Sequence, residues 1–218
     1  MKTVYFVRHG ESEANAGAPL FQGDESPLTE RGRQQARFIA KRCSRLPVDA
    51  ILASSAVRAQ DTAGYISEAL GKSIETEPLL TERIMPEELH GKPVADTDAD
   101  RLFLDWDKSF FDESLKVGTG ENFTELKERA KEALELLAER PERHILVVTH
   151  GFFLRMLIAQ MTFGPGLSVD EFKQIIQTFR TANTGLTVTE YEPKTGGADA
   201  LPPPKWLVRA WNDHAHLG

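Results

Sequence analysis

The 218-residue sequence has one cysteine and no long apolar run. A single thiol forms no internal disulfide and no thiolate metal cluster, and the place of Cys43 in a helical pattern beside Lys41 and Arg42 favours a small packing residue over a nucleophile. No stretch approaches the roughly 18 apolar residues of a membrane helix, and residues 4–7 are too short for a signal-peptide core. The sequence therefore predicts a cytoplasmic protein that does not enter a membrane.

Basic residues are also in deficit, with 26 Lys and Arg against 33 Asp and Glu, for a formal net charge of −7. This balance disfavours nucleic acid and anionic membranes as partners, so a local basic cluster must attract any anionic ligand. The chain has no P-loop signature, no HExxH motif and no carboxylate-rich cage, which favours chemistry without a nucleotide, a metal or another cofactor.

Apolar and amphipathic segments alternate along what we expect to be a single domain over residues 1–218. Strands are predicted at 2–7, 49–54, 73–80, 144–149, 184–192 and 205–211, and helices at 28–46, 55–70, 121–139 and 151–161. The alternation predicts an α/β three-layer sandwich with a mostly parallel sheet, and the last two strands add an antiparallel edge strand. We expect residues 84–118 to form a small inserted helical cap or lid. Its aromatic residues Phe103, Trp106, Phe110 and Phe111 have an exposed pattern and would either line the substrate entrance or pack inside the lid.

Three of the predicted strands end in basic motifs. RHG (8–10) follows the first strand, SSAVR (54–58) follows the second, and THG (149–151) ends the strand near the C-terminus. Because ligands bind at the carboxyl edge of open α/β sheets, two histidines and two arginines should meet there. Gly10 and Gly151 lack a Cβ atom, which permits a sharp exit from the strand and lets an anion approach the backbone.

The residue types at this edge suit phosphoryl transfer. Arg8 and Arg58 are charged forks that match phosphate oxygens and would neutralise a transferring phosphoryl group. Nearby positive charge keeps an imidazole neutral and frees a nitrogen lone pair for attack. One histidine of the pair His9 and His150 would attack phosphorus, and the other would donate a hydrogen bond to an equatorial oxygen.

Several longer stretches carry a resemblance to a known family. They are FVRHGESEAN (6–15), QGDESPLTERGRQQA (22–36), ILASSAVRAQDTA (51–63), LLTER (79–83), GENFTELKERA (120–130) and VVTHG (147–151). In this order, they resemble the histidine phosphatase superfamily, whose phosphoglycerate-mutase-like members share the Arg-His-Gly motif. The resemblance covers most of the chain and implies that His9 is the nucleophile, forming a phosphohistidine.

The same resemblance implies roles for other residues of these motifs. Arg8, Arg58 and His150 would complete the catalytic phosphate pocket. Asn15 would be an additional phosphate contact, and the substrate-facing loop would include Gln22 and Gly23.

Glu82 in LTER matches the general acid of the family, which protonates the leaving oxygen and then deprotonates water during hydrolysis. Glu87 and Glu88 are close enough in sequence to be alternatives. Arg83 has two interpretations, since it would either bind substrate or pair with an acidic neighbour.

Two departures from the mutase pattern favour hydrolysis. After Arg83 the chain continues with IMPEELHGK, where the mutases typically have His-Tyr-Gly. The second His-Gly motif continues as THGFFLR, where the mutases typically have Gly-Asn. We therefore expect a metal-independent phosphomonoesterase acting on a small phosphorylated substrate. The alternatives are a phosphoglycerate-type mutase with the same groups and a non-enzymatic phosphate-binding or interaction module, and a homodimer remains open.

Overall fold

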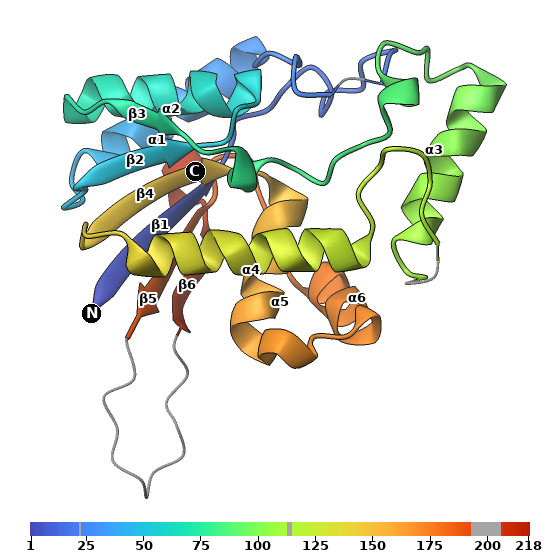
Figure 1. The fold of residues 1–218 in the computed structure, drawn as a ribbon. Helices are drawn as coiled ribbons and strands as arrows, with labels where there is room; N and C mark the ends of the chain where they lie inside the picture. The colour runs from blue at the N-terminus through green and yellow to red at the C-terminus, as the bar shows by residue number, and fades with distance from the viewer. Residues whose placement is uncertain (22, 113–114, 193–205) are drawn as a thin grey trace, which may run out of the picture.

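Figure 1 shows the protein as a computed structural model, which describes residues 1–21, 23–112, 115–192 and 206–218. In this part of the chain a six-stranded sheet lies between two layers of helices. The strands are β1 (Lys2–Arg8), β2 (Ala50–Ala53), β3 (Ile74–Thr76), β4 (His144–Thr149), β5 (Leu186–Tyr191) and β6 (Trp206–Asp213). The α-helices are α1 (Glu30–Cys43), α2 (Val57–Leu70), α3 (Thr97–Ser109), α4 (Phe123–Glu139), α5 (Gly151–Phe163) and α6 (Val169–Thr178). None of the helices in the described ranges has the length and apolarity needed to cross a membrane.

The strands lie in the order β3-β2-β4-β1-β5-β6. β4 pairs in parallel with both β1 and β2, and β2 pairs in parallel with β3. β5 is antiparallel to β1 and to β6, so it alone runs against the other strands. The predicted α/β fold with a mostly parallel sheet and an antiparallel edge is confirmed, with β6 outermost and β5 between it and β1.

Alternate side chains of the strands pack against opposite helical layers. Val7 and Val148 belong to a cluster with α1 and α2, whereas Phe6 and Val147 belong to a cluster with α4, α5 and α6. Cys43 is buried in the first cluster, and burial raises the pKa of its thiol to about 12. A sheet covered on both faces explains why the central strands are almost entirely apolar.

Side-chain caps fix where several helices begin. Thr29 accepts a backbone N–H of the first turn of α1, and Asn122 forms a reciprocal capping box with Glu125 at the start of α4. The sequence analysis predicts no helix at α6, although Ser168 and Glu171 form the same kind of capping box there. This motif was the available signal for α6.

The strand predicted at 73–80 is shorter in the structure. β3 ends at Thr76, and Pro78 begins a 3-10 turn, Pro78–Leu80, because proline has no N–H to continue a sheet ladder. The hydroxyl of Thr149 donates to the carbonyl of Leu80 over 2.7 Å. This bond holds the segment after β3 against the carboxyl end of β4.

The described residues of 84–118 leave the sheet and carry α3, which lies on the side of the strands' carboxyl ends (Figure 1). The loop after β1 joins them through its backbone. The N–H of Phe21 donates to the carbonyl of Lys92 (2.9 Å), and the N–H of Val94 donates to that of Pro19 (2.8 Å). The cap is therefore built from two separate pieces of the chain.

Two of the aromatic residues expected to be exposed are buried. Trp106 is 8% exposed and Phe110 is 0% exposed, which contradicts exposure and agrees with the alternative that these rings pack inside the lid. The ring of Phe110 lies 5.1 to 5.6 Å from the rings of Phe111, Phe123, Phe152 and Phe172. This aromatic cluster joins the end of α3 to α4, α5 and α6, which the local sequence of the cap does not reveal.

Candidate active site

The ends of β1 and β4 bring two histidines together. The strands are adjacent and parallel, with Arg8 opposite Thr149, so His9 and His150 leave the sheet side by side. Their ring centroids are 5.0 Å apart, with the ring planes at 60°. Both side chains are buried, His9 with 3% exposure and His150 with none.

The glycines after the two histidines allow close packing. Neither Gly10 nor Gly151 has a positive φ. A Cβ atom on Gly10 would lie 2.6 Å from the carbonyl oxygen of Gly32, and one on Gly151 would lie 2.7 Å from Oγ1 of Thr181. The close approach of neighbouring groups, rather than a left-handed turn, therefore requires glycine at both positions.

The hydrogen bonds of His9 select one tautomer. Its Nδ1 lies 2.7 Å from the carbonyl oxygen of Gly10, which only accepts, so Nδ1 carries the hydrogen. Nε2 keeps its lone pair and accepts from Nε of Arg58 over 3.3 Å. Burial, followed by the positive charges of Arg58 and Arg8, holds the pKa of His9 well below its usual range. His9 is therefore a neutral imidazole at neutral pH, with its basic nitrogen facing a guanidinium.

His150 is held from the opposite side by β2, since its Nε2 lies 2.7 Å from Oγ of Ser54, directly after that strand. Burial is the main reason that the pKa of His150 lies well below its usual range, and the neighbouring His9 and Arg58 lower it further. Among the described residues, five buried side-chain polar atoms have no hydrogen-bond partner, and two of them, Nδ1 of His150 and Nε of Arg8, lie at this site. Because such atoms are uncommon, they leave hydrogen-bonding capacity for an anion at this site.

Backbone carbonyls fix the two arginines. Nη1 of Arg8 donates to the carbonyl of Thr181 (2.7 Å), and Nη1 of Arg58 donates to that of Gly23 (2.9 Å). Burial lowers the pKa of both arginines and the carboxylate of Glu82 raises it again, so both guanidinium groups stay charged at neutral pH. The site thus holds two oriented cations.

Glu82 lies at the N-terminus of α5. Its Oε1 accepts from the backbone N–H of Phe153 (2.8 Å) and of Arg83 (3.1 Å), and its Oε2 accepts from that of Phe152 (3.1 Å). The first N–H groups of a helix have no partner within the helix, so this carboxyl group satisfies two of them. Because α5 begins directly after His150, Glu82 is held at the same edge of the sheet.

A cleft of about 540 Å³ runs from this edge along the cap. Its lining includes Arg58, Glu82 and Gly23, and the remaining lining residues are Leu20, Phe21, Asp24, Glu25, Thr81, Arg83, Ile84, Met85, His90, Gly91, Phe103 and Trp106. Glu87 and Glu88, the alternatives to Glu82, do not line it and are exposed on the 3-10 turn Glu87–Leu89. Glu82 is therefore the one of these three carboxylates that faces the cleft.

A turn at residues 181–185 completes the site, although no motif in the sequence points to it. The side-chain amide of Asn183 donates to the carbonyl of His9 (3.0 Å), and the N–H of Thr184 donates to that of Arg8 (2.9 Å). Thr184 has a φ of 57°, a strained backbone for a β-branched residue. Since β5 runs against β1, the chain entering β5 meets the carboxyl end of β1, and this polar stretch was the available signal.

The other predicted binding residues lie around this centre. Oδ1 of Asn15 accepts from Nδ2 of Asn183 (3.2 Å) and from Nη2 of Arg8 (3.5 Å). Gly23 lines the cleft through the loop that also holds Arg58. Gln22 lies outside the described residues.

Arg83 is 7% exposed and ties α3 to the body of the protein. Its Nε donates to the carbonyl of Glu121 (3.0 Å), its Nη2 donates to that of Trp106 (2.7 Å), and its Nη1 lies 3.7 Å from Asp107. The guanidinium carbon lies 3.9 Å from the ring centre of Trp106 and 4.3 Å from that of Phe110. Burial lowers the pKa of Arg83 to about 10, which still leaves it charged at neutral pH.

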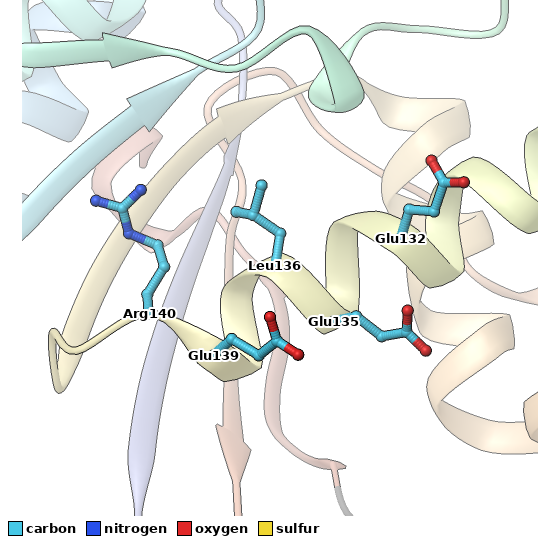
Figure 2. A pocket seen from close by; sticks show the side chains of 5 residues that line it. All are labelled: Glu132, Glu135, Leu136, Glu139 and Arg140. Atoms are coloured by element: carbon cyan, nitrogen blue, oxygen red, sulfur yellow. The ribbon is translucent and has the colours of Figure 1, made fainter.

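A second hollow, of about 500 Å³, lies along the C-terminal half of α4, and its five lining residues include none of the residues around the histidines (Figure 2). Glu132, Glu135 and Glu139 surround it, and Arg140 is already paired with Glu75 and Glu142. The three carboxylates would repel a phosphate group. Within the described ranges, no three His, Cys, Asp or Glu side chains are arranged to hold a metal ion.

Comparison with known proteins places this geometry in context. The sequence profile described as histidine phosphatase superfamily (branch 1) matches residues 4–201. The chain is 30% identical over 223 residues to the "Probable phosphoglycerate mutase GpmB" of Serratia proteamaculans (strain 568), with all of this chain and 95% of the relative covered.

Solved structures share the same architecture. Bacillus stearothermophilus YhfR superposes with a TM-score of 0.79 at 26% identity, over the whole of both chains. The alpha-ribazole phosphatase from Shigella flexneri superposes with a TM-score of 0.76 at 23% identity, covering 98% of this chain and 97% of that one. At this level of identity the second likeness shows the fold alone.

Proposed function

Because the chain belongs to the histidine phosphatase superfamily, whose members work through a phosphohistidine, we propose that it is a metal-independent phosphomonoesterase with His9 as its nucleophile. The observation that supports this most strongly is the state of His9. Its Nδ1 donates to the carbonyl of Gly10, its pKa lies well below the usual range, and its unprotonated Nε2 faces Arg58. A neutral imidazole beside fixed cations is suited to attack a phosphate ester.

The reaction has two steps. Nε2 of His9 bonds to phosphorus while the ester P–O bond breaks and Glu82 gives a proton to the leaving oxygen. Water then attacks phosphorus and gives a proton to Glu82, the P–N bond breaks, and inorganic phosphate leaves. Arg8, Arg58 and His150 bind the phosphoryl oxygens and stabilise the charge that develops on them.

The remaining predicted residues have supporting roles in this proposal. Asn15 adds a contact to the phosphate, and Gly23 belongs to the loop that faces the substrate. For Arg83, the ion pair with Asp107 favours the second interpretation, in which it supports the cap instead of binding substrate.

The proposal is tested with p-nitrophenyl phosphate in the presence of EDTA. We expect the purified protein to release phosphate without added metal and the His9→Ala variant to lose at least about a thousandfold in kcat, because it removes the nucleophile. His144→Ala is the matched control, since His144 begins β4 at the far end from the site. Undiminished turnover by His9→Ala would overturn the proposal.

A mutase is the second candidate, and the observation that favours it is the name of the curated relatives, which are 30% identical over their nearly full length. A mutase would use the same groups but return the phosphoryl group to the substrate before water attacks. Product analysis with 3-phosphoglycerate separates the two: relocation of the phosphoryl group supports the mutase, and release of inorganic phosphate alone supports the phosphatase.

A further inference from the structure

Three aromatic rings form one wall of the cleft that opens from Arg58 and Glu82. The rings of Phe21 and Phe103 are stacked with centroids 5.1 Å apart, and Phe103 lies 5.7 Å from Trp106 in a tilted arrangement. Phe21 and Phe103 are partly exposed, so the wall faces the cleft instead of being sealed in the core. It offers an apolar, aromatic surface in the same cleft as Arg58 and Glu82.

Further apolar and acidic residues line the cleft beside the rings. Leu20, Ile84 and Met85 extend the apolar surface, while Asp24 and Glu25 carry exposed carboxylates. A negatively charged group that entered the cleft beside the rings would therefore meet charges of its own sign.

Arg83 does not offset these carboxylates. Its guanidinium is stacked between two aromatic rings and donates to two backbone carbonyls. Among the described residues that line the cleft, Arg58 and His90 are the remaining basic side chains, and Arg58 faces His9. The cleft beyond the phosphoryl site therefore lacks a free arginine or lysine for a substrate carboxylate.

We propose that the leaving group of the substrate is uncharged and carries an aromatic ring, which binds against Phe21, Phe103 and Trp106. This inference rests on the proposed phosphatase activity and names the substrate class for the same site.

The chemistry of the wall explains the selectivity. An aromatic leaving group gains apolar burial and ring stacking against Phe21 and Phe103. A phosphoglycerate would place its carboxylate beside apolar side chains and near Asp24 and Glu25, without a free arginine or lysine among the described lining residues to pair with. The cleft therefore discriminates by charge and by shape.

The test compares three phosphates of primary alcohols, so that the leaving oxygens are chemically alike: 2-phenylethyl phosphate, propyl phosphate and 3-phosphoglycerate. We expect kcat/KM to be at least about tenfold higher for 2-phenylethyl phosphate than for 3-phosphoglycerate, with propyl phosphate between them. An equal or higher value for 3-phosphoglycerate would overturn the inference. If the protein releases phosphate from none of the three substrates, the proposed function itself is overturned.

Variants locate the selectivity in the wall. Phe103→Ala should lower the ratio of kcat/KM for 2-phenylethyl phosphate over propyl phosphate about fivefold, mainly through KM, because the stacking surface is lost. Leu104→Ala, at an exposed neighbouring position of α3 outside the cleft, should leave the ratio unchanged. Phe103→Leu keeps the apolar volume and should give an intermediate ratio, which guards against a simple loss of folding.

A second variant tests the charge. Asp24→Asn should raise kcat/KM for 3-phosphoglycerate relative to propyl phosphate about threefold, because one repelling carboxylate is removed. If both Phe103→Ala and Asp24→Asn leave their ratios unchanged, the proposed substrate class is wrong.

Discussion

At the scale of single residues, the chemistry depends on the distance between Arg58 and His9. The Nε–H of Arg58 donates to Nε2 of His9 over 3.3 Å, and its charge lowers the pKa of the imidazole. In the proposed mechanism the arginine therefore has two effects, since it binds phosphate and it keeps the proposed nucleophile unprotonated.

Removal of this charge should move the acid limb of the activity profile. In Arg58→Gln, the pKa of His9 rises, His9 becomes protonated at higher pH, and the acid limb of kcat/KM shifts to higher pH. The measurement is a pH profile with one substrate, normalised to its maximum. Arg37→Gln, which removes an exposed arginine from α1, should leave the limb in place. An unshifted limb in Arg58→Gln would show that this charge does not control His9.

At the scale of elements, α4 fixes the segment that carries Glu82. Arg129 on α4 forms a two-fold ion pair with the buried Glu121, over 2.8 and 2.7 Å. It also donates to the carbonyls of Leu79 (2.8 Å), Thr81 (2.8 Å) and Glu82 (3.2 Å). One partly buried arginine therefore holds the backbone that carries the proposed general acid.

Loss of Arg129 should destabilise the protein. Arg129→Met leaves the Glu121 carboxylate buried without its partner, and we expect a loss of about 3 kcal/mol in the free energy of unfolding, measured by urea denaturation. The double variant Arg129→Met with Glu121→Leu should recover part of this loss, because it leaves no unpaired charge. Lys131→Met, which breaks an exposed pair with Glu128 on the same helix, should leave the denaturation midpoint unchanged.

The arrangement of the strands and helices explains which site residues could be predicted from the sequence and which could not. His9 and His150 were predictable because each follows an apolar run whose carboxyl end lies at one sheet edge. The contacts of Asn183 depend on the direction of β5, which a short strand does not reveal by itself. The burial of Phe110 likewise depends on partners from three distant helices, and local periodicity does not identify them.

At the scale of the whole molecule, two neutral histidines are enclosed in the fold. Unfolding returns His9 and His150 to a pKa of about 6.5, whereas both have a pKa well below this value in the folded protein. Below about pH 6.5 the unfolded chain therefore binds protons that the folded chain does not, so stability falls as the pH falls. Arg42 holds the pKa of carboxylates such as Asp213 low. The stability that these ionised carboxylates contribute is lost only at lower pH, where they become protonated.

This linkage predicts a loss of stability in mild acid. Between pH 7.5 and pH 5.5, the free energy of unfolding should fall by up to about 1.4 kcal/mol per pH unit for each histidine once the pH is below about 6.5. Denaturant titrations at both pH values measure it, and His9→Gln should show about half of the change. A free energy of unfolding that is the same at both pH values would contradict the burial of neutral imidazoles.

The way in which Arg83 holds α3 has a consequence for binding thermodynamics. Because Trp106 is clamped by Arg83 and Phe103 lies against both Trp106 and Phe21, the rings are already ordered before any ligand arrives. The protein therefore loses little conformational entropy when a ligand binds. Calorimetry of an aromatic ligand should accordingly show a negative heat-capacity change from apolar burial alone, without the larger change that accompanies coupled folding.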